Sequence, residues 1–592
     1  MKPIKFFHLL TIVFLINNFS CQKDDGLSGN NNPQENIPDT FSEYFGSEIS
    51  RDFLGTVIDK NHNPIEGAAI TIGGETAMTD SNGVFIIRDA NVNKRFGYVK
   101  AEKAGYIHAS RSVVPSNGTN KVTIMMLEET VVGTISSGST STVTIDGGSS
   151  VSFDGNFIKE DGSAYEGSVD VIMHHLDPTD EDMSMQMPGM LYAENENGAE
   201  RMLQTLGMLA VELRGSGGED LNLAEGSTSE IKIPVDAGLM SMAPATIPLW
   251  YFDEANGFWK EEGQATLQGN IYVGTVSHFS FWNCDIPAEA ITLCVTATTD
   301  DNIPLANMPV SITSTTFGTT YGYTNDNGEV CGYVPSNESL ILNIYSYAIC
   351  GNIPLYTETI APFSSDSNFT VIIPDNPDLI QETVIGTFNN CEGNPVTDGY
   401  VQISYGNQIF INNITNGDFE INLLRCAENN TFTIAGSNYM DFHTTGNINY
   451  TFNTSITDIG TLSACDTVTE YIEYTIDDNI SEVFFDNITV TRNSNNFLIG
   501  VYINNWYFSL IAPNELGTSY TSLDDGGTHM NFTFQENNEN YHVLASNYGI
   551  EVNVNVLGEN VGEYIDVNFI GDFPFSDTTR TIIGSTHVKI DE

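Results

Sequence analysis

The residues that most suggest metal chemistry are two adjacent histidines followed by acidic and sulfur-containing side chains. His174 and His175 precede Asp177, and four methionines follow between residues 183 and 190. Imidazole and thioether groups together suit copper, whereas carboxylates suit a harder ion. Adjacent residues of a strand point to opposite faces, so the two histidines cannot both bind one ion from a regular strand. We therefore favour a loop whose methionines pack onto a sheet.

Two acidic turns could bind calcium through oxygen atoms. The turns are Thr79–Gly83 and Thr324–Gly328, which share the pattern Thr-x-x-Asn-Gly. Neither has the twelve-residue ligand spacing that ends in a bidentate glutamate. Calcium bound there would screen charge and stiffen the chain rather than catalyse, and we expect no other cofactor. The ligand candidates are Asp80, Asn82, Asn325 and Asp326.

A group of aromatic residues between 247 and 285 could form a stacking platform for sugar rings. The apolar face of a sugar packs on an aromatic ring when polar groups lie beside it. The alternative, which we favour, is that these side chains fill a sandwich core. The candidates for ligand binding are Trp250, Tyr251, Trp259 and Trp282.

Motifs that would indicate catalysis are missing from the sequence. It contains no Gly-x-Ser-x-Gly elbow, no His-Glu-x-x-His pair and no Walker loop. Ser277, His278 and Asp285 do not form a triad by their spacing. Paired carboxylates carry little information in a chain with 77 acidic residues. We therefore predict that the protein is not an enzyme and has no catalytic residues.

Composition limits the fold class and the kind of partner. The 592 residues carry a formal net charge of −56, which disfavours nucleic acid because such binding needs Lys and Arg to neutralise phosphates. The 40% hydrophobic and 10% aromatic content argues against disorder. Abundant Asn, Thr, Gly, Val and Ile indicate strands separated by turns. We expect an all-β protein of about four or five domains.

Residues 51–128 alternate apolar and polar side chains, as the strands of a β-sandwich do. Turn signals separate the strands at Asn63-Pro64 and at Thr79–Gly83, where Gly83 supplies a positive φ. This order of motifs resembles the carboxypeptidase regulatory-like domain, a small transthyretin-like β-sandwich. In that family the module accompanies the peptidase and does no chemistry itself.

The same layout recurs in residues 288–374 and 380–465, each with a strand followed by a glycine turn. The third copy has a shortened turn, and residues 374–378 read as a linker. We expect these transthyretin-like or immunoglobulin-like sandwiches to be joined in series as a rod.

Two further segments are also β-rich. Residues 129–287 include an aromatic β-hairpin whose turn runs from Asp253 to Gly257. They resemble the extracellular region that follows the regulatory-like module in cartilage intermediate layer protein. That resemblance implies an extracellular scaffold without a known active site. We expect residues 466–592 to form a C-terminal β-sandwich domain, whose closing stretch, residues 562–584, resembles C-terminal domains of bacteroidete lipoproteins.

The N-terminus resembles an export signal. Lys2 and Lys5 precede an apolar run from residue 6 to 16, which is too short to span a bilayer. Ser20-Cys21 ends a segment that resembles a bacterial lipoprotein signal, and an ordinary secretory signal is the alternative. The resemblance implies a signal peptide in residues 1–20 and lipidation of Cys21, followed by a flexible stalk to residue 50. The export signal of bacteroidete surface lipoproteins resembles Gln22, Lys23, Asp24 and Asp25. These features imply a lipid anchor in the outer membrane that faces the exterior.

Seven cysteines remain once Cys21 is assigned to lipid. Their clustering in two neighbouring modules of an exported protein suggests disulfides, and an odd number leaves at least one thiol. The pairing is left open, and no spacing suggests zinc. The candidates are Cys284, Cys294, Cys331, Cys350, Cys391, Cys426 and Cys465.

Three functions follow from these observations. We favour a non-catalytic surface lipoprotein that acts as an adhesion or scaffold module array. The second is a glycan-binding lipoprotein of a nutrient-uptake system, and the third is a hydrolase hidden in residues 129–287 or 466–592. The expected partners are the outer membrane, through Cys21, and a polysaccharide or an extracellular protein.

Overall fold

The computed structural model is almost entirely β-structure, as the composition predicts. Cys21 and the tetrapeptide Gln22 to Asp25 lie outside the described residues. Among the described residues, no helix is both long and apolar enough to cross a membrane. The structure describes residues 40–591 apart from 181, 407, 441–442, 454, 468–469, 478–479, 485–486, 504–505, 523–526, 537–538, 559–563 and 576–577.

The first β-sandwich, called module 1, packs a three-stranded sheet, β4-β1-β7, against a four-stranded sheet, β3-β2-β5-β6. Its first and last strands pair in parallel, with Phe53 opposite Asn120. Alternating buried side chains of both sheets form one core. The strands are β1 (Glu48–Ile58), β2 (Ala69–Ile72), β3 (Glu75–Met78), β4 (Val84–Asn93), β5 (Gly97–Glu102), β6 (Ala109–Val113) and β7 (Asn120–Met125).

Module 2 repeats this topology strand for strand, with sheets β25-β22-β28 and β24-β23-β26-β27. Its first and last strands, β22 and β28, are again parallel. Repeated β-sandwich domains, expected from the sequence, are therefore confirmed. The strands are β22 (Ala290–Thr298), β23 (Pro309–Ser314), β24 (Gly318–Tyr323), β25 (Glu329–Pro335), β26 (Leu340–Tyr345), β27 (Pro354–Ile360) and β28 (Ser367–Ile372).

Module 3 has the same plan, with sheets β32-β29-β36 and β31-β30-β33-β34-β37. The glycine turn recurs as well, because Gly83, Gly328 and Gly417 all have φ between +69° and +85°. Each carbonyl accepts a hydrogen bond from the first strand of its module. The strands are β29 (Leu379–Asn390), β30 (Gly399–Tyr405), β31 (Gln408–Ile414), β32 (Asp418–Cys426), β33 (Thr431–Asn438), β34 (His443–Thr444), β35 (Ile448–Thr451), β36 (Ile456–Ala464) and β37 (Asp466–Thr467).

Between modules 1 and 2 lies the large-sheet domain, whose strands form one 14-stranded sheet. Strand β15 serves two cores, since Leu209 points into one apolar cluster and Met208 into another. The predicted aromatic hairpin is present as β18 and β19. The strands are β8 (Val131–Ser136), β9 (Ser141–Thr144), β10 (Ser150–Phe153), β11 (Phe157–Lys159), β12 (Ala164–Tyr165), β13 (Ser168–Leu176), β14 (Tyr192–Glu194), β15 (Glu200–Gly215), β16 (Asp220–Leu223), β17 (Ser229–Pro234), β18 (Thr246–Asp253), β19 (Phe258–Gln268), β20 (Ile271–Val276) and β21 (Phe281–Ala288), and a short helix, α1 (Met183–Gln186), precedes β14.

The C-terminal domain is a sandwich of sheets β39-β38-β48-β47-β46-β43 and β40-β41-β42-β44-β45 with a core of its own. The strands are β38 (Tyr471–Ile476), β39 (Ile480–Phe484), β40 (Ile488–Arg492), β41 (Asn496–Ile503), β42 (Trp506–Pro513), β43 (Gly517–Tyr520), β44 (His529–Glu536), β45 (Glu539–Val543), β46 (Glu551–Leu557), β47 (Tyr564–Phe575) and β48 (Thr578–Lys589).

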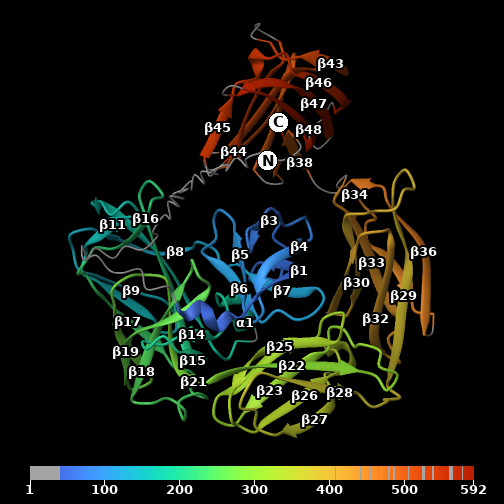
Figure 1. The fold of residues 1–592 in the computed structure, drawn as a ribbon. Helices are drawn as coiled ribbons and strands as arrows, with labels where there is room; N and C mark the ends of the chain where they lie inside the picture. Colours follow the sequence, from blue (N-terminus) through green and yellow to red (C-terminus); the bar gives the residue numbers. More distant parts are fainter. Residues whose placement is uncertain are drawn as a thin grey trace, which may run out of the picture.

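The modules do not form the rod that we expected from their repetition. Figure 1 shows module 1 in the middle, with the large-sheet domain, module 2 and module 3 arranged around it. Side chains of module 3 reach back to module 1 across more than 300 residues of sequence. The prediction of a rod is therefore wrong, because specific contacts hold module 3 against module 1.

Disulfides tie part of this arrangement together. Cys294–Cys331 joins β22 to β25 within module 2, and Cys391–Cys465 closes module 3. Cys350–Cys426 links module 2 to module 3 across a separation of 76 residues. The apolar cores of these two modules form one continuous cluster. Cys284, one of the seven candidates, is not in a disulfide, because it is a buried free cysteine of β21.

Candidate functional site

The first contact that shapes the molecule is built on the glycine turn of module 1. The Asp80 carboxylate accepts hydrogen bonds from the backbone N–H groups of Asn82 and Val84, at 2.9 Å each. Its second oxygen accepts the hydroxyl of Tyr400 at 2.8 Å and that of Tyr439 at 3.4 Å, both from module 3. Burial raises the pKa of the Asp80 carboxyl, so these donors offset the cost of removing it from water.

Polar and apolar contacts surround that carboxylate. Asn82 donates to the Tyr400 hydroxyl at 2.8 Å, and Arg88 forms an ion pair with Asp398 at 2.6 Å. Beneath them, Tyr400 and Ile411 of module 3 form an apolar cluster with Leu54 and Val84 of module 1. Module 3 is thus docked on module 1 through both kinds of contact.

The equivalent turn of module 2 also contacts module 1. Asn325 donates to the Ser116 hydroxyl at 3.0 Å and to the backbone carbonyl of Asn117 at 2.6 Å. Asp326 forms an ion pair with Lys121 at 2.9 Å. The four residues proposed as calcium ligands therefore take part in contacts between modules, because each makes a hydrogen bond or an ion pair to another module.

A third contact joins module 1, the large-sheet domain and module 2 at one point. Arg95 of module 1 lies 3.1 Å from Glu200 and 3.2 Å from Asp366. Beside it, the rings of Tyr192 and Tyr333 stack with their centroids 4.2 Å apart. We call module 1 the hub, because all three of these contacts converge on it.

The aromatic candidates for ligand binding are wrong, and the core role that we favoured for them is the one they have. Trp250, Trp259 and Trp282 are fully buried, and Tyr251 is half-buried against the core. Trp250 and Trp259 pack in a cluster that includes Ile107 of module 1. A ring with no exposed face cannot stack on a sugar, so the aromatic hairpin serves to dock the large-sheet domain on the hub.

The two histidines project from opposite faces of one strand. His174 and His175 lie on the regular strand β13, opposite Ala210 and Leu209. The Nε2 atom of His174 is 2.8 Å from a backbone carbonyl, and the Nδ1 atom of His175 is 2.9 Å from the hydroxyl of Ser149. The expected loop is thus wrong for the histidines, whereas the expected packing of methionines occurs at the buried Met183 and Met187.

A cluster of titratable groups lies where the hub meets the large-sheet domain. His108 Nδ1 is 3.7 Å from Glu254, and the backbone N–H of His108 donates to Glu212 at 3.1 Å. Burial and the neighbouring charges of Glu212 and Asp253 raise the pKa of Glu254 to about 8, and burial lowers the pKa of His108 to about 3. Arg214 pairs with Glu212, Glu129 and Asp220, which leaves the cluster an acidic junction rather than an open catalytic cleft.

Other groups with potential for chemistry are buried or already bonded. Asp285 is fully buried, and burial raises the pKa of its carboxyl well above the ordinary value. Cys294, Glu329 and Cys331 lie close enough to share an ion, but the two sulfur atoms are bonded to each other.

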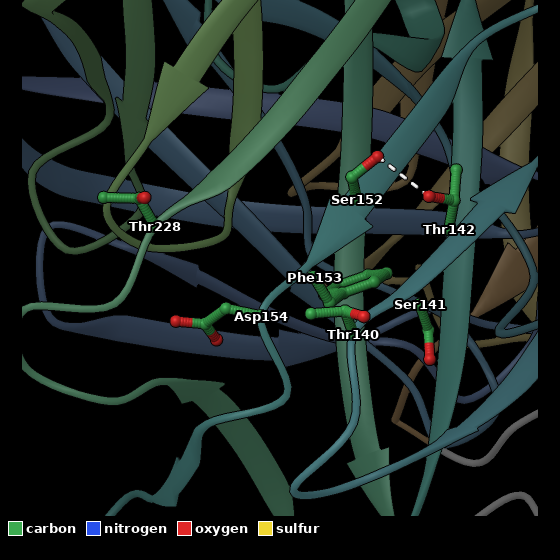
Figure 2. Close-up of a pocket in the computed structure, with 7 residues that line it drawn as sticks. All are labelled: Thr140, Ser141, Thr142, Ser152, Phe153, Asp154 and Thr228. Atoms are coloured by element: carbon green, nitrogen blue, oxygen red, sulfur yellow. Dashed lines mark hydrogen bonds between the residues drawn. The ribbon is translucent and has the colours of Figure 1, made fainter.

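An open hollow of about 440 Å³ lies beside the edge strand β9, and Figure 2 shows the side chains that line it. Hydroxyl groups line most of it, and those of Thr142 and Ser152, on the neighbouring strands β9 and β10, lie 2.9 Å apart. The aromatic ring of Phe153 is buried and offers no platform. The hollow holds a single acidic side chain, Asp154, so it lacks the pair of carboxylates that a glycosidase needs.

Sequence reasoning missed the partners that make the hub. Tyr400 and Tyr439 read as ordinary core residues of alternating strands, and Arg88 reads as a surface charge. The one relevant signal in the sequence is the turn pattern that modules 1 and 2 share, because both of these turns contact another module.

Comparison with known proteins gives limited support for a relationship. No protein-family model matches the chain. Cartilage intermediate layer protein 2 of Mus musculus is 30% identical over 118 residues, which is 20% of this chain. The chain spans about a tenth of the length of that relative. The resemblance to cartilage intermediate layer protein is therefore supported only over part of the chain.

Solved structures give distant matches. The shaft pilin spaA from Lactobacillus rhamnosus GG matches with 13% identity, 30% of this chain, all of that chain and a TM-score of 0.15. The Bacillus anthracis TIE protein matches with 9% identity, 72% of this chain, 73% of that chain and a TM-score of 0.14. At such TM-scores these likenesses carry no argument about function.

Proposed function

We propose that the chain is a non-catalytic scaffold of the cell surface, which holds β-sandwich modules rigidly for adhesion. One observation carries the proposal: polar turns and shared apolar clusters dock the large-sheet domain, module 2 and module 3 on the hub. Domains of one chain move relative to one another by default unless the interfaces are large and apolar. Docking of this kind fixes the directions in which the outer sheet faces point.

The anchor in this proposal is lipid on Cys21, with residues 22–25 directing export to the outer face of the outer membrane. The acidity of the chain supports lipid as the anchor, because a net charge of −56 is repelled by anionic headgroups. Several acyl chains on one cysteine would bind far more stably than a single chain.

Display is tested with a Gram-negative host that makes the full chain. Protease is added to intact cells, and a periplasmic protein of the same cells serves as the control for leakage. We expect the full chain to be digested while the control survives, and Cys21→Ser to release the chain from the membrane fraction. Protection of the full chain in intact cells would refute surface display.

Adhesion is tested with the same cells on surfaces coated with extracellular-matrix proteins or polysaccharides. Cells that display the chain should adhere more than cells carrying the empty vector. Soluble chain, residues 22–592, should compete for the same surface. Equal adhesion by both cell types on every coating would refute the adhesive role.

A further inference from the structure

The outer face of module 2 has the composition of a ligand-binding platform. It belongs to the sheet β24-β23-β26-β27, whose other face covers the shared core of modules 2 and 3. In Figure 1 the labelled strands of this sheet, β23, β26 and β27, lie on the side of module 2 that points away from the hub. Tyr321 is 77% exposed and Tyr323 is 60% exposed, both on the edge strand β24.

Strand register places polar groups directly beside these rings. Tyr321 lies opposite Ser311, Ser311 opposite Asn343, and Asn343 opposite Thr357. Directly opposed residues of antiparallel strands project from the same face of a sheet. Ser311 is only 2% exposed, so the row presents to solvent the ring of Tyr321, the half-buried amide of Asn343 and the exposed hydroxyl of Thr357.

Hydrogen bonds hold the polar groups of this row in place. Asn343 donates to the Ser311 hydroxyl at 3.4 Å, and Thr357 donates to the Asn343 carbonyl oxygen at 2.9 Å. Ser311 in turn donates to the hydroxyl of Tyr345 at 3.5 Å. The buried Ser311 hydroxyl thus orients the Asn343 amide, and the remaining donors and acceptors of Asn343 and Thr357 are available to a ligand without reordering.

The face is also uncharged. The residues of β23, β24 and β26 that point outward are Ser, Thr, Asn, Tyr, Pro and Ile, as are Thr357 and Thr359 of β27. In a chain with a net charge of −56, an uncharged face avoids the repulsion and desolvation that a carboxylate would impose on a neutral ligand.

We propose that the outer face of module 2 binds a neutral polysaccharide. The rings of Tyr321 and Tyr323 would pack on the apolar faces of sugar residues, while Asn343 and Thr357 exchange hydrogen bonds with sugar hydroxyls. A protein partner would call for a larger apolar centre than this face provides. The inference deepens the proposed adhesive role by naming the class of ligand.

The platform is flat, so we expect weak binding, with a dissociation constant on the order of 0.1–1 mM. Soluble chain, residues 22–592, is run through native gels that contain a β-glucan, a mannan, a galactan or the anionic polysaccharide pectate. Chain that binds is retarded, and the retardation gives the affinity. The variants are Tyr321→Ala with Tyr323→Ala, and Tyr321→Phe. Tyr502→Ala is the matched control, since Tyr502 is 74% exposed on the C-terminal domain.

We expect at least one neutral polysaccharide to retard the chain and pectate not to. The double alanine variant should bind roughly tenfold more weakly, while Tyr321→Phe and Tyr502→Ala bind as the parent does. Unchanged circular dichroism and melting temperature would confirm that the double variant is folded. A panel in which no neutral polysaccharide binds, or in which the double variant binds normally, would overturn the inference. So would binding that depends on Tyr321 and Tyr323 but is seen only with matrix proteins.

These outcomes are separable from failure of the proposed function. Adhesion and surface display that persist alongside a blank polysaccharide panel would overturn the polysaccharide site alone. Loss of display would overturn the surface role and leave the gel result standing.

Discussion

The substitution Tyr400→Phe tests how module 3 is held on the hub. It removes a hydroxyl that donates to Asp80 and accepts from Asn82, each at 2.8 Å. The ring remains in its apolar cluster with Leu54 and Val84, so the change isolates the hydrogen bonds from the packing.

The magnitude follows from the burial of the partners. Tyr400 is 1% exposed, so water cannot readily replace the hydroxyl that Asp80 loses as a donor. A hydrogen bond to a charged group contributes about 1.5–3 kcal/mol. Opening of the contact between module 3 and the hub should therefore become about 10–150 times more favourable.

Hydrogen exchange measured by mass spectrometry reports this opening. The backbone N–H groups of Asn82 and Val84, which bond to Asp80, should exchange faster in the variant by that factor. Arg88→Gln is the comparison, because the Arg88 and Asp398 side chains are 33% and 38% exposed. An exposed ion pair contributes less than about 1 kcal/mol and weakens in salt. Unchanged exchange in Tyr400→Phe, or a larger effect in Arg88→Gln, would refute the reasoning.

Four further predictions concern the buried groups. The pKa of Glu254 is raised to about 8, so its stabilising contribution is full below pH 4.5 and is lost as the pH rises through 8. His108, whose pKa is lowered to about 3, is neutral throughout that upper range, so the melting temperature should fall between pH 6.5 and 9 and Glu254→Gln should flatten the fall. The effect should be modest, because 40% of the Glu254 side chain is exposed. Arg425→Ala should cost about 3–5 kcal/mol of unfolding free energy, because Glu382 is fully buried and pairs with Arg425 at 2.8 Å, and Arg425→Met with Glu382→Met should cost much less. Residues 22–592 should show no thiol reactive to Ellman's reagent when folded and one in denaturant, since Cys284 is buried and burial raises the pKa of its thiol. A calcium chelator should leave the melting temperature unchanged, because hydrogen bonds and an ion pair already occupy the acidic turns.

Each of these predictions has a contradicting result. A melting temperature that rises between pH 6.5 and 9 would contradict the pKa of Glu254. Equal losses for the single and double variants at Arg425 would show that the ion pair is not the cause. A reactive thiol in the folded chain would place Cys284 at the surface. A lower melting temperature in the chelator would establish calcium as part of the fold.

Local patterns in the sequence predict the modules well. Alternation and the turn of Thr79–Gly83 depend on neighbours in the chain, and a carbon added at Gly83 would lie 2.4 Å from the Val57 carbonyl oxygen. The same requirement holds at Gly328 beside Ala297. Such constraints act within one module, which is why the repeated sandwich can be recognised without a structure.

The arrangement of the modules could not be predicted in this way. Asp80 and Tyr400 are 320 residues apart, and nothing local distinguishes Tyr400 from a core tyrosine. The pairing Cys350–Cys426, which crosses from module 2 to module 3, is likewise one of many that seven cysteines allow.

The exposed face of module 2 could not be predicted from the sequence either. Thr320 and Gly322, which lie opposite Ile312 and Val310 on the inner face, are less apolar than Tyr321 and Tyr323. A prediction from the alternation of apolar and polar residues would therefore place Tyr321 and Tyr323 on the buried face of the sheet. For the tryptophans, the favoured prediction of a core role is confirmed, but the sequence did not show that Trp250 and Trp259 pack in a cluster shared with module 1.

Electron microscopy of single particles of residues 22–592 tests the central claim, that the modules are docked around a hub and present fixed outer faces. The account predicts class averages in which module 1 is enclosed by the large-sheet domain, module 2 and module 3. Extended particles with the modules strung in a line would contradict it.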